Sequence, residues 1–311
     1  MKKILVFGSN GLVGKSLRRL LSKKFNQENL FFSTRDDTNL FSYEETKNTI
    51  DEIKPDVLIN AAAKVGGIYA NNTNRTEFLI ENLKINLNIL ESTIDHKDTL
   101  IINLGSSCIY PLNAENPIKE ESIMSGKLEP TNSPYAMAKL TAIEIGRSLK
   151  AEYGHKIINL MPTNLYGPND FFHPKLGHVI PSLMYRMHQA KVDENNEIKI
   201  WGTGEPLREF LHVEDLALAI EHIISIETDY DLLNIGSGEE VTIKFLGELL
   251  KDVIGFKGNI SFDNSMPNGN PRKLLDSSLI NSLGWLSSID LRTGLTQTYS
   301  WFLKNIQHLR L

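Results

Sequence analysis

The sequence predicts an α/β protein in which a doubly wound parallel sheet is joined to a smaller α+β domain. Short β-branched or apolar runs alternate with amphipathic runs over the first 165 residues, which is typical of successive βα units. A glycine-rich turn connects the first of these strands to the first helix. After residue 166 the alternation loosens, which indicates a second domain that is built differently.

The composition is that of a globular protein. Of the 311 residues, 41% are hydrophobic and 23% are charged, so there is ample material for a buried core. The net charge is -5 and the basic residues are scattered, which gives no support for a nucleic-acid partner. Cys108 is the only cysteine, so we expect no disulfide framework and no metal site. The apolar runs are too short for a membrane span or a signal peptide, and we expect a cytoplasmic protein without a membrane partner.

The first βα unit carries a dinucleotide-binding pattern. The predicted strand Lys3–Phe7 runs into a turn with three glycines, and the amphipathic run Lys15–Lys24 follows. In such a Rossmann-type turn the glycines allow a tight bend, close approach of a pyrophosphate and packing of helix on strand, although a plain βα turn is the alternative. The helix N-terminus then faces the phosphates. The expected cofactor-binding residues are Gly8, Ser9, Asn10, Gly11, Leu12, Val13 and Gly14.

The next strand, Leu30–Thr34, ends at Arg35, where an NAD site usually places an acidic residue. A guanidinium suits a 2′-phosphate, so we predict NADP(H) as the cofactor. Asp36 and Asp37 follow at once and weaken this preference, and Arg35 as a plain surface charge is the alternative.

The chain between these strands and residue 104 continues the alternation. We predict a helix over Thr46–Lys54, a strand over Asp56–Ala63, a loop over Gly66–Asn72 and a helix over Glu77–Ile94. The strand ends in small residues, so the cofactor can lie against Ala62. The apolar positions expected to face the core from the second helix are Phe78, Leu83, Leu87 and Leu90.

The strand Leu100–Leu104 delivers two candidate catalytic side chains. The hydroxyl of Ser106 can share a carbonyl oxygen through a hydrogen bond, and Cys108 follows two residues later. If the extended conformation continues, Ser106 and Cys108 lie on the same face.

Tyr135 and Lys139 lie four residues apart in a predicted helix that begins near Pro134 and ends about Tyr153, so both emerge on one face. A neighbouring ammonium favours the phenolate and opposes the ordinary tyrosine pKa of about 10. Tyr135 can then give a proton to a carbonyl oxygen as hydride reaches the carbon. Taken alone, the pair is better explained as a half-buried aromatic and a surface charge, and the rest of the chain is what favours the catalytic interpretation.

The later elements are predicted with the same patterns. Strands are expected over Ile157–Met161, within Ile198–Leu211 on either side of a Gly-x-Gly turn, and over Leu232–Gly238. Helices are expected over Val213–Ser225, Ile243–Val253, Ser277–Leu283 and Leu291–Asn305. We therefore predict a cofactor domain of residues 1–165 with a returning segment at about 211–236, and a substrate domain of residues 166–210 and 237–311.

Seven blocks together resemble a known family. They read AAKVGGIYANNT, LGSSCIYP, LEPTNSPYAMAK, MPTNLYGPND, HVIPSL, WGTGEPLREFLHVEDLA and PRKLLD. The chain resembles the extended short-chain dehydrogenase/reductases and, among them, the GDP-L-fucose synthases. The resemblance implies epimerisation of carbons 3 and 5 of a GDP-4-keto-6-deoxy-sugar and NADPH-dependent reduction at carbon 4, for surface glycans such as capsular polysaccharide. It also implies a homodimer through the helices near Glu77–Ile94 and Ala136–Tyr153, although one subunit alone can cover their apolar stripes.

The resemblance also implies roles for single residues. Cys108 and His178 match the family's acid/base pair for epimerisation, whereas a small buried thiol and a loop histidine are the bland alternatives. The matching substrate-binding positions are Ser107, Asn164, Arg186, Trp201, Arg208, Lys273 and Asp276. The matching cofactor positions beyond the glycine turn and Arg35 are Ala62, Leu104, Gly105, Lys139, Pro162, Asn164, Leu165 and His178.

Three departures from the family pattern leave other functions open. The glycine turn lacks the histidine and arginine common in the family, Tyr69 replaces a common histidine, and Phe171 replaces a frequent asparagine. The first alternative is a carbon-4 reductase of a GDP-6-deoxy-4-keto-heptose with little epimerase activity. The others are an epimerase or dehydratase that retains its cofactor, and a cofactor-sensing binding protein with a decayed site.

Overall fold

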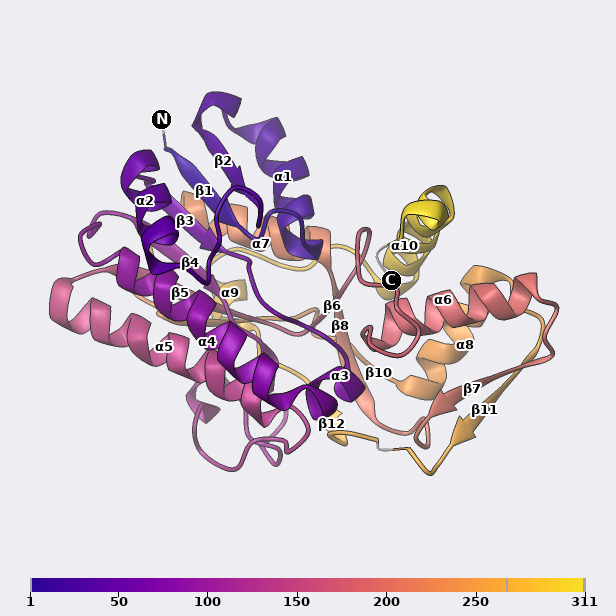
Figure 1. The fold of residues 1–311 in the computed structure, drawn as a ribbon. Coiled ribbons are helices and arrows are strands. Elements are labelled where there is room, and N and C mark those ends of the chain that lie inside the picture. The colour runs from indigo at the N-terminus through magenta and orange to yellow at the C-terminus, as the bar shows by residue number, and fades with distance from the viewer. Residues whose placement is uncertain (1, 267, 310–311) are drawn as a thin grey trace.

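The computed structural model describes residues 2–266 and 268–309, and its centre is a six-stranded parallel sheet (Figure 1). The strand order is β2-β1-β3-β4-β5-β9, so the chain starts in the sheet interior and winds to both edges. This confirms the predicted α/β class and the doubly wound sheet. The strands are β1 (Ile4–Phe7), β2 (Leu30–Ser33), β3 (Val57–Asn60), β4 (Leu100–Leu104), β5 (Lys156–Pro162) and β9 (Leu232–Ile235).

Helices cover both faces of this sheet (Figure 1). Strand side chains alternate between the faces, so Ile4 and Val6 of β1 join one core while Leu5 and Phe7 join the other. The first core includes residues of α1 (Leu12–Lys24) and α7 (Val213–Ser225). The second includes residues of α2 (Tyr43–Ile53), α4 (Arg75–Ser92) and α5 (Ser133–Tyr153). Burial on both faces explains why these strands read as continuous apolar runs.

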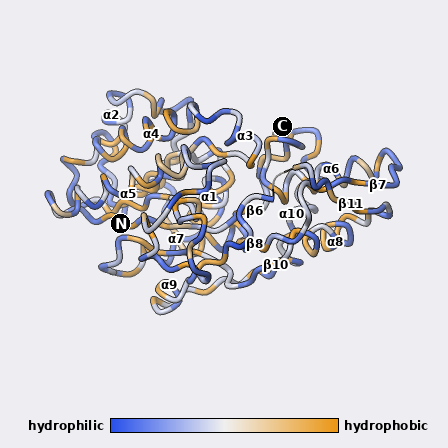
Figure 2. The backbone as a smooth tube through the Cα atoms, turned by 90° about the horizontal axis from the view of Figure 1, so that it is seen from below, coloured by the Kyte–Doolittle hydropathy of each residue, from blue (hydrophilic) through white to orange (hydrophobic). Residues whose placement is uncertain are grey.

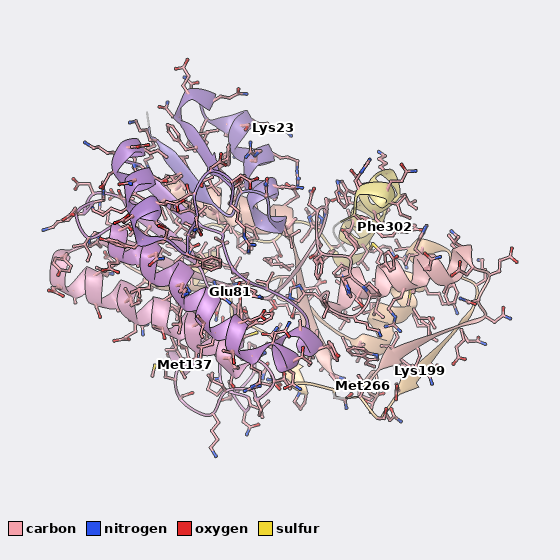
Figure 3. All side chains as sticks on the ribbon, in the orientation of Figure 1. Lys23, Glu81, Met137, Lys199, Met266 and Phe302 are labelled. Carbon is pink, nitrogen blue, oxygen red and sulfur yellow. The ribbon has the colours of Figure 1, made fainter. Side chains whose placement is uncertain are left out.

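A second group of elements surrounds a separate core. Its β-structure is a sheet of β10 (Glu240–Thr242), β8 (Leu207–His212) and β12 (Arg272–Lys273), with β6 (Asn164–Tyr166) also paired to β8, and a two-stranded sheet of β7 (Glu197–Trp201) and β11 (Asn259–Asp263). The helices around this core are α6 (Val179–Val192), α8 (Ile243–Ile254) and α10 (Leu291–Asn305), and Phe302 of α10 is fully buried in it (Figure 3). Figure 2 shows hydrophilic and hydrophobic residues alternating along the helices, the pattern of helices with one buried face.

The structure differs from the sequence prediction in two helices and one core position, and it adds the unpredicted strands β6, β10, β11 and β12. Residues 66–72, predicted as a loop, contain most of the short helix α3 (Ile68–Thr73), and the unassigned stretch after residue 169 contains α6. The helix predicted over Ser277–Leu283 is present as α9 (Ser278–Ser282). Leu87 was predicted to face the core, but its side chain is 47% exposed because Ile85 and Ile89 fill that side of α4. α3 is too short to show a helical period, whereas α6 carries one in Ile180, Leu183, Met184 and Met187 that the sequence analysis did not use.

A row of buried asparagines crosses the middle of the main sheet. The strand register places Asn103 beside both Asn60 and Asn159. Asn60 donates to Asn103 at 2.9 Å, and Asn103 donates to Asn159 at 3.0 Å. Asn60 also donates to Asn86 of α4 and accepts from the backbone of Ala62 at 3.1 Å. A one-residue slip of any of these strands would bury unpaired amides, so the row fixes the register.

Within the described residues, none of the helices combines the length and the hydropathy that crossing a membrane requires.

We predict that Gly14→Ala lowers the free energy of unfolding by about 1–3 kcal/mol, the usual cost of overpacking. A Cβ at Gly14 would lie 2.3 Å from the carbonyl oxygen of Gly8, so α1 must shift away from the preceding turn. Gly11→Ala is the matched control, because a Cβ there meets only the same oxygen, at 3.4 Å. Urea unfolding of both variants measures the difference, and equal stabilities would contradict this account of the turn.

Candidate active site

A cavity of about 370 Å³ lies where three strands of the main sheet end. Its lining includes residues 61–63 after β3, the last residue of β4 with residues 105–108, and the last residue of β5 with residues 163–165. The carboxyl ends of the strands are where open α/β sheets bind ligands. Its opposite wall comes from α6, β7, β8 and the chain before β12, so the cavity lies between the two cores.

The glycine turn at one end of the cavity fits a dinucleotide. Gly8 has a φ of +76°, and a Cβ there would lie 2.6 Å from the backbone nitrogen of Ala62. Gly11 is the N-cap of α1, no side chain caps the helix, and the first turn holds no acidic residue. Backbone N–H groups and the positive end of the helix dipole are therefore available for phosphate groups. Of the seven predicted turn residues, Val13 lines the cavity itself.

Arg35 lies exposed in the turn after β2. Of the two acidic residues that follow Arg35, Asp37 is hydrogen-bonded within the same turn. The carboxylate of Asp37 accepts hydrogen bonds from the Thr34 backbone at 2.9 Å and from the Thr34 hydroxyl at 2.7 Å, which hold the pKa of Asp37 below its usual value. The Asp37 carboxylate therefore binds Thr34, and within the described residues it forms no ion pair with Arg35.

Lys139 is almost completely buried, and its ammonium donates to the carbonyl oxygen of Leu104 at 2.7 Å. Burial lowers the pKa of Lys139 to about 8. The ammonium nitrogen lies 5.8 Å from the centre of the Tyr135 ring, so the predicted helical pairing of the two residues is present.

The expected lowering of the Tyr135 pKa is not found. Burial, together with the nearby Cys108, raises the pKa of this phenol above its usual value. Tyr135 packs with Ala70 and Phe78 in an apolar cluster, where the phenolate is poorly solvated. Tyr135 therefore holds its proton at neutral pH, as a proton donor must.

Ser106 and Cys108 both line the cavity, but not from one extended strand as the sequence suggested. The chain turns into a short 3₁₀ helix at Ser107–Ile109, because the Ser106 hydroxyl accepts a hydrogen bond from the Cys108 backbone at 3.3 Å. Because of this turn, Ser106 and Cys108 do not share the face of one extended strand. The amide of Asn132 donates to the Cys108 sulfur at 3.4 Å.

His178 is the N-cap of α6 and lines the same cavity as Cys108. Burial lowers its pKa, so the imidazole is neutral at pH 7. A neutral imidazole carries one N–H donor and one acceptor nitrogen, which suits proton transfer in either direction.

Most of the predicted substrate-binding residues also line the cavity. Arg186 donates to the Lys199 carbonyl, and Arg208 donates to the carbonyl oxygens of Leu207 and Asn268. Asp276 is not part of the lining, and its carboxylate instead accepts from the Ser278 backbone at 2.9 Å. The predicted positions that do line the cavity, besides the catalytic five, are Val13, Ala62, Leu104, Gly105, Ser107, Pro162, Asn164, Leu165, Arg186, Trp201, Arg208 and Lys273.

The two unusual aromatic residues occupy different places. Tyr69 of α3 lines the cavity, and its ring centre lies 6.3 Å from that of Trp201 at the end of β7. Phe171 does not line the cavity but stacks on His173. Two lining residues that the sequence analysis did not single out, Glu129 and Asn132, come from the block LEPTNSPY just before α5. The cluster of polar side chains just before the Tyr135 helix is the sequence feature that could have identified these two residues.

The model of the NAD dependent epimerase/dehydratase family matches residues 4–236. The chain is 47% identical to GDP-L-fucose synthase 1 of Arabidopsis thaliana over 98% of this chain and 94% of the relative. It is 40% identical to GDP-L-fucose synthase of Escherichia coli (strain K12) over 99% of each chain. A solved GDP-mannoheptose C4 reductase from Campylobacter jejuni with NADP bound superimposes with a TM-score of 0.85 at 32% identity, covering 97% of this chain and 98% of that one. The chain belongs to the NAD dependent epimerase/dehydratase family and, within it, to the GDP-L-fucose synthase family that its sequence blocks resemble.

Proposed function

We propose that this protein reduces the carbon-4 ketone of a GDP-4-keto-6-deoxy-sugar with NADPH and also epimerises carbons 3 and 5, as in GDP-L-fucose synthesis. One observation carries the proposal. A single cavity holds the reductase group Ser106, Tyr135 and Lys139 together with the acid/base candidates Cys108 and His178.

The cofactor is NADP(H), held by the glycine turn and by Arg35 as the partner of a 2′-phosphate. When bound, it supplies the hydride for the carbonyl carbon. Tyr135 gives its proton to the carbonyl oxygen, and the Ser106 hydroxyl hydrogen-bonds the same oxygen. The buried ammonium of Lys139 stabilises the negative charge that Tyr135 carries after it gives up its proton.

The same oxygen contacts support epimerisation. Hydrogens on the carbons beside a ketone are acidic because the resulting anion delocalises onto the carbonyl oxygen, where Ser106 and Tyr135 stabilise it. Cys108 and His178 reach the cavity from different elements, the turn after β4 and the start of α6. One removes a proton from the carbon and the other returns a proton to the opposite face, which inverts the centre.

Two arginines and a tryptophan suit the GDP portion. Guanidinium groups bind diphosphate oxygens through paired donors, and the indole of Trp201 offers a flat wall for a base or sugar. We assign residues 1–165 with about 211–236 to the cofactor, and residues 166–210 with 237–311 to the GDP-sugar. Residues 1, 267 and 310–311 of these ranges lie outside the described residues.

The GDP-heptose reductases support a second candidate function. A carbon-4 reductase of a GDP-heptose is a solved neighbour at 32% identity, and Tyr69 changes the cavity wall relative to the family pattern. The higher identities, 40–47%, belong to GDP-L-fucose synthases, so the deoxy-hexose is the first choice.

The deciding experiment is incubation with NADPH and GDP-4-keto-6-deoxy-mannose in deuterated water, followed by proton NMR. We expect NADPH oxidation with deuterium at carbons 3 and 5, and loss of that deuterium in Cys108→Ala because the acid/base pair is broken. Tyr135→Phe should lower kcat by at least about 100-fold, since it lacks the proton donor. Oxidation without deuterium would identify a reductase alone, and no reaction would direct the search to GDP-heptoses.

The reductase should lose activity at alkaline pH. Because the pKa of Lys139 is about 8, its ammonium is present below that pH and is lost above it. We expect kcat/KM, which reports the free enzyme, to fall above about pH 8. Arginine stays charged throughout, so Lys139→Arg should show no such decline, whatever its absolute activity. An identical decline in both proteins would assign the titration to another group.

We also propose a cytoplasmic homodimer joined through α4 and α5. These helices lie side by side (Figure 1), and three of their apolar side chains are 45–50% exposed: Ile80, Leu87 and Met137. Figure 3 shows Met137 on the outer side of α5. Leu87→Glu should shift the mass measured by light scattering from two chains to one, because a buried unpaired charge is costly. A monomeric wild-type protein would contradict the proposal.

A further inference from the structure

Asn132 is the residue before α5 and has an unusual set of contacts. Asparagine at an N-cap normally accepts a hydrogen bond from the first turn of its helix, but the Asn132 side chain makes no such cap. It donates instead to the sulfur of Cys108 at 3.4 Å. Its other amide atom, Oδ1, is buried and has no hydrogen-bond partner among the described residues. The missing side-chain cap and the unpaired Oδ1 atom both cost stability. Asn132 is held in this arrangement, in which its N–H group donates to the sulfur.

The loop before α5 holds the Asn132 amide in place. The carboxylate of Glu129, which is 8% exposed, accepts from the backbone of Asn132 at 3.2 Å and from the Thr131 hydroxyl at 2.6 Å. Arg75 of α4 donates to the carbonyl oxygen of Pro130 at 2.7 Å and to the Ser133 hydroxyl at 3.2 Å. These contacts hold the backbone from which the Asn132 amide reaches the sulfur.

Apart from Asn132, Cys108 lies against apolar side chains and near one guanidinium, that of Arg208. Ala70, Phe78 and Tyr135 pack around its sulfur. In residues 2–266 and 268–309, the Asn132 amide is the one recorded hydrogen-bond donor to this sulfur. Tyr135 of α5 and Arg208 of β8 interact electrostatically with Cys108, and the ionisable groups Glu129 and His178 line the same cavity.

We infer that Asn132 is a positioning residue for the acid/base chemistry of Cys108. Its N–H group fixes the sulfur toward the cavity and favours the thiolate, the form that can remove a proton from carbon. The inference rests on the proposed function only for the role of the thiolate in epimerisation.

The test uses the single cysteine of the chain. Alkylation by iodoacetamide in the absence of substrate reports the thiolate of Cys108 alone, since the chain has no other cysteine. We expect Asn132→Ala to slow alkylation at pH 7 roughly tenfold, as loss of a charge-assisted hydrogen bond implies. Asn132→Asp keeps the shape, removes the donor and adds a like charge, so it should slow alkylation at least as much. Unfolding would expose the thiol, so a slower reaction does not arise from loss of the fold.

Asn74→Ala is the matched control, because Asn74 is also an N-cap without a side-chain cap, before α4, and is exposed. It should alkylate at the wild-type rate. With substrate, the two Asn132 variants should incorporate deuterium more slowly while NADPH oxidation on an already epimerised substrate is retained. Wild-type alkylation rates in both Asn132 variants would overturn the inference. A third outcome separates the two proposals: the Asn132 variants are alkylated slowly, but the wild-type enzyme exchanges no deuterium. The role of Asn132 at the thiol would then stand, and the proposed epimerisation would be refuted.

Discussion

The buried hydrogen bond between the Lys139 ammonium and the Leu104 carbonyl is the interaction on which the site depends. It joins α5 to the end of β4, where the chain leaves the sheet and turns toward Ser106 and Cys108. A buried ammonium requires such a partner, because an unpaired charge in this position would be poorly solvated. The hydrogen bond thus fixes the distance between the helix that carries Tyr135 and the turn that carries the serine and the cysteine.

The sheet supplies the second constraint. The row Asn60, Asn103 and Asn159 ties three adjacent strands together by side-chain hydrogen bonds, and its Asn60 end also holds the backbone at Ala62. Polar groups in a dry core are tolerated only when they are paired, so the row admits one register. That register places the ends of β3, β4 and β5 at one edge, where their following residues together form the cavity.

Burial also sets the protonation of the site. Removal from water lowers the pKa of Lys139 and of His178, and it raises the pKa of Tyr135, because each loses solvation of its charged form. The result is a protonated phenol and a neutral imidazole beside an ammonium that is close to titration. Each is the form that reduction or epimerisation of a ketone requires.

The sequence by itself determined the types and order of most elements, since periodicity records which faces are buried, and α7 and α10 end at the predicted residues. It also determined the family, because the blocks around Cys108 and His178 are specific. It missed α3, which is too short to show a period, and α6, whose apolar spacing was present but unassigned. It misjudged the Tyr135 pKa, because a spacing of four residues reveals a neighbouring charge but not the apolar cluster that outweighs it. Only the tertiary structure decided that Asn132 contacts Cys108 and that Asp276 lies outside the cavity. Such contacts join residues distant in the chain, and they depend on the packing of whole helices against the sheet, which local patterns do not record.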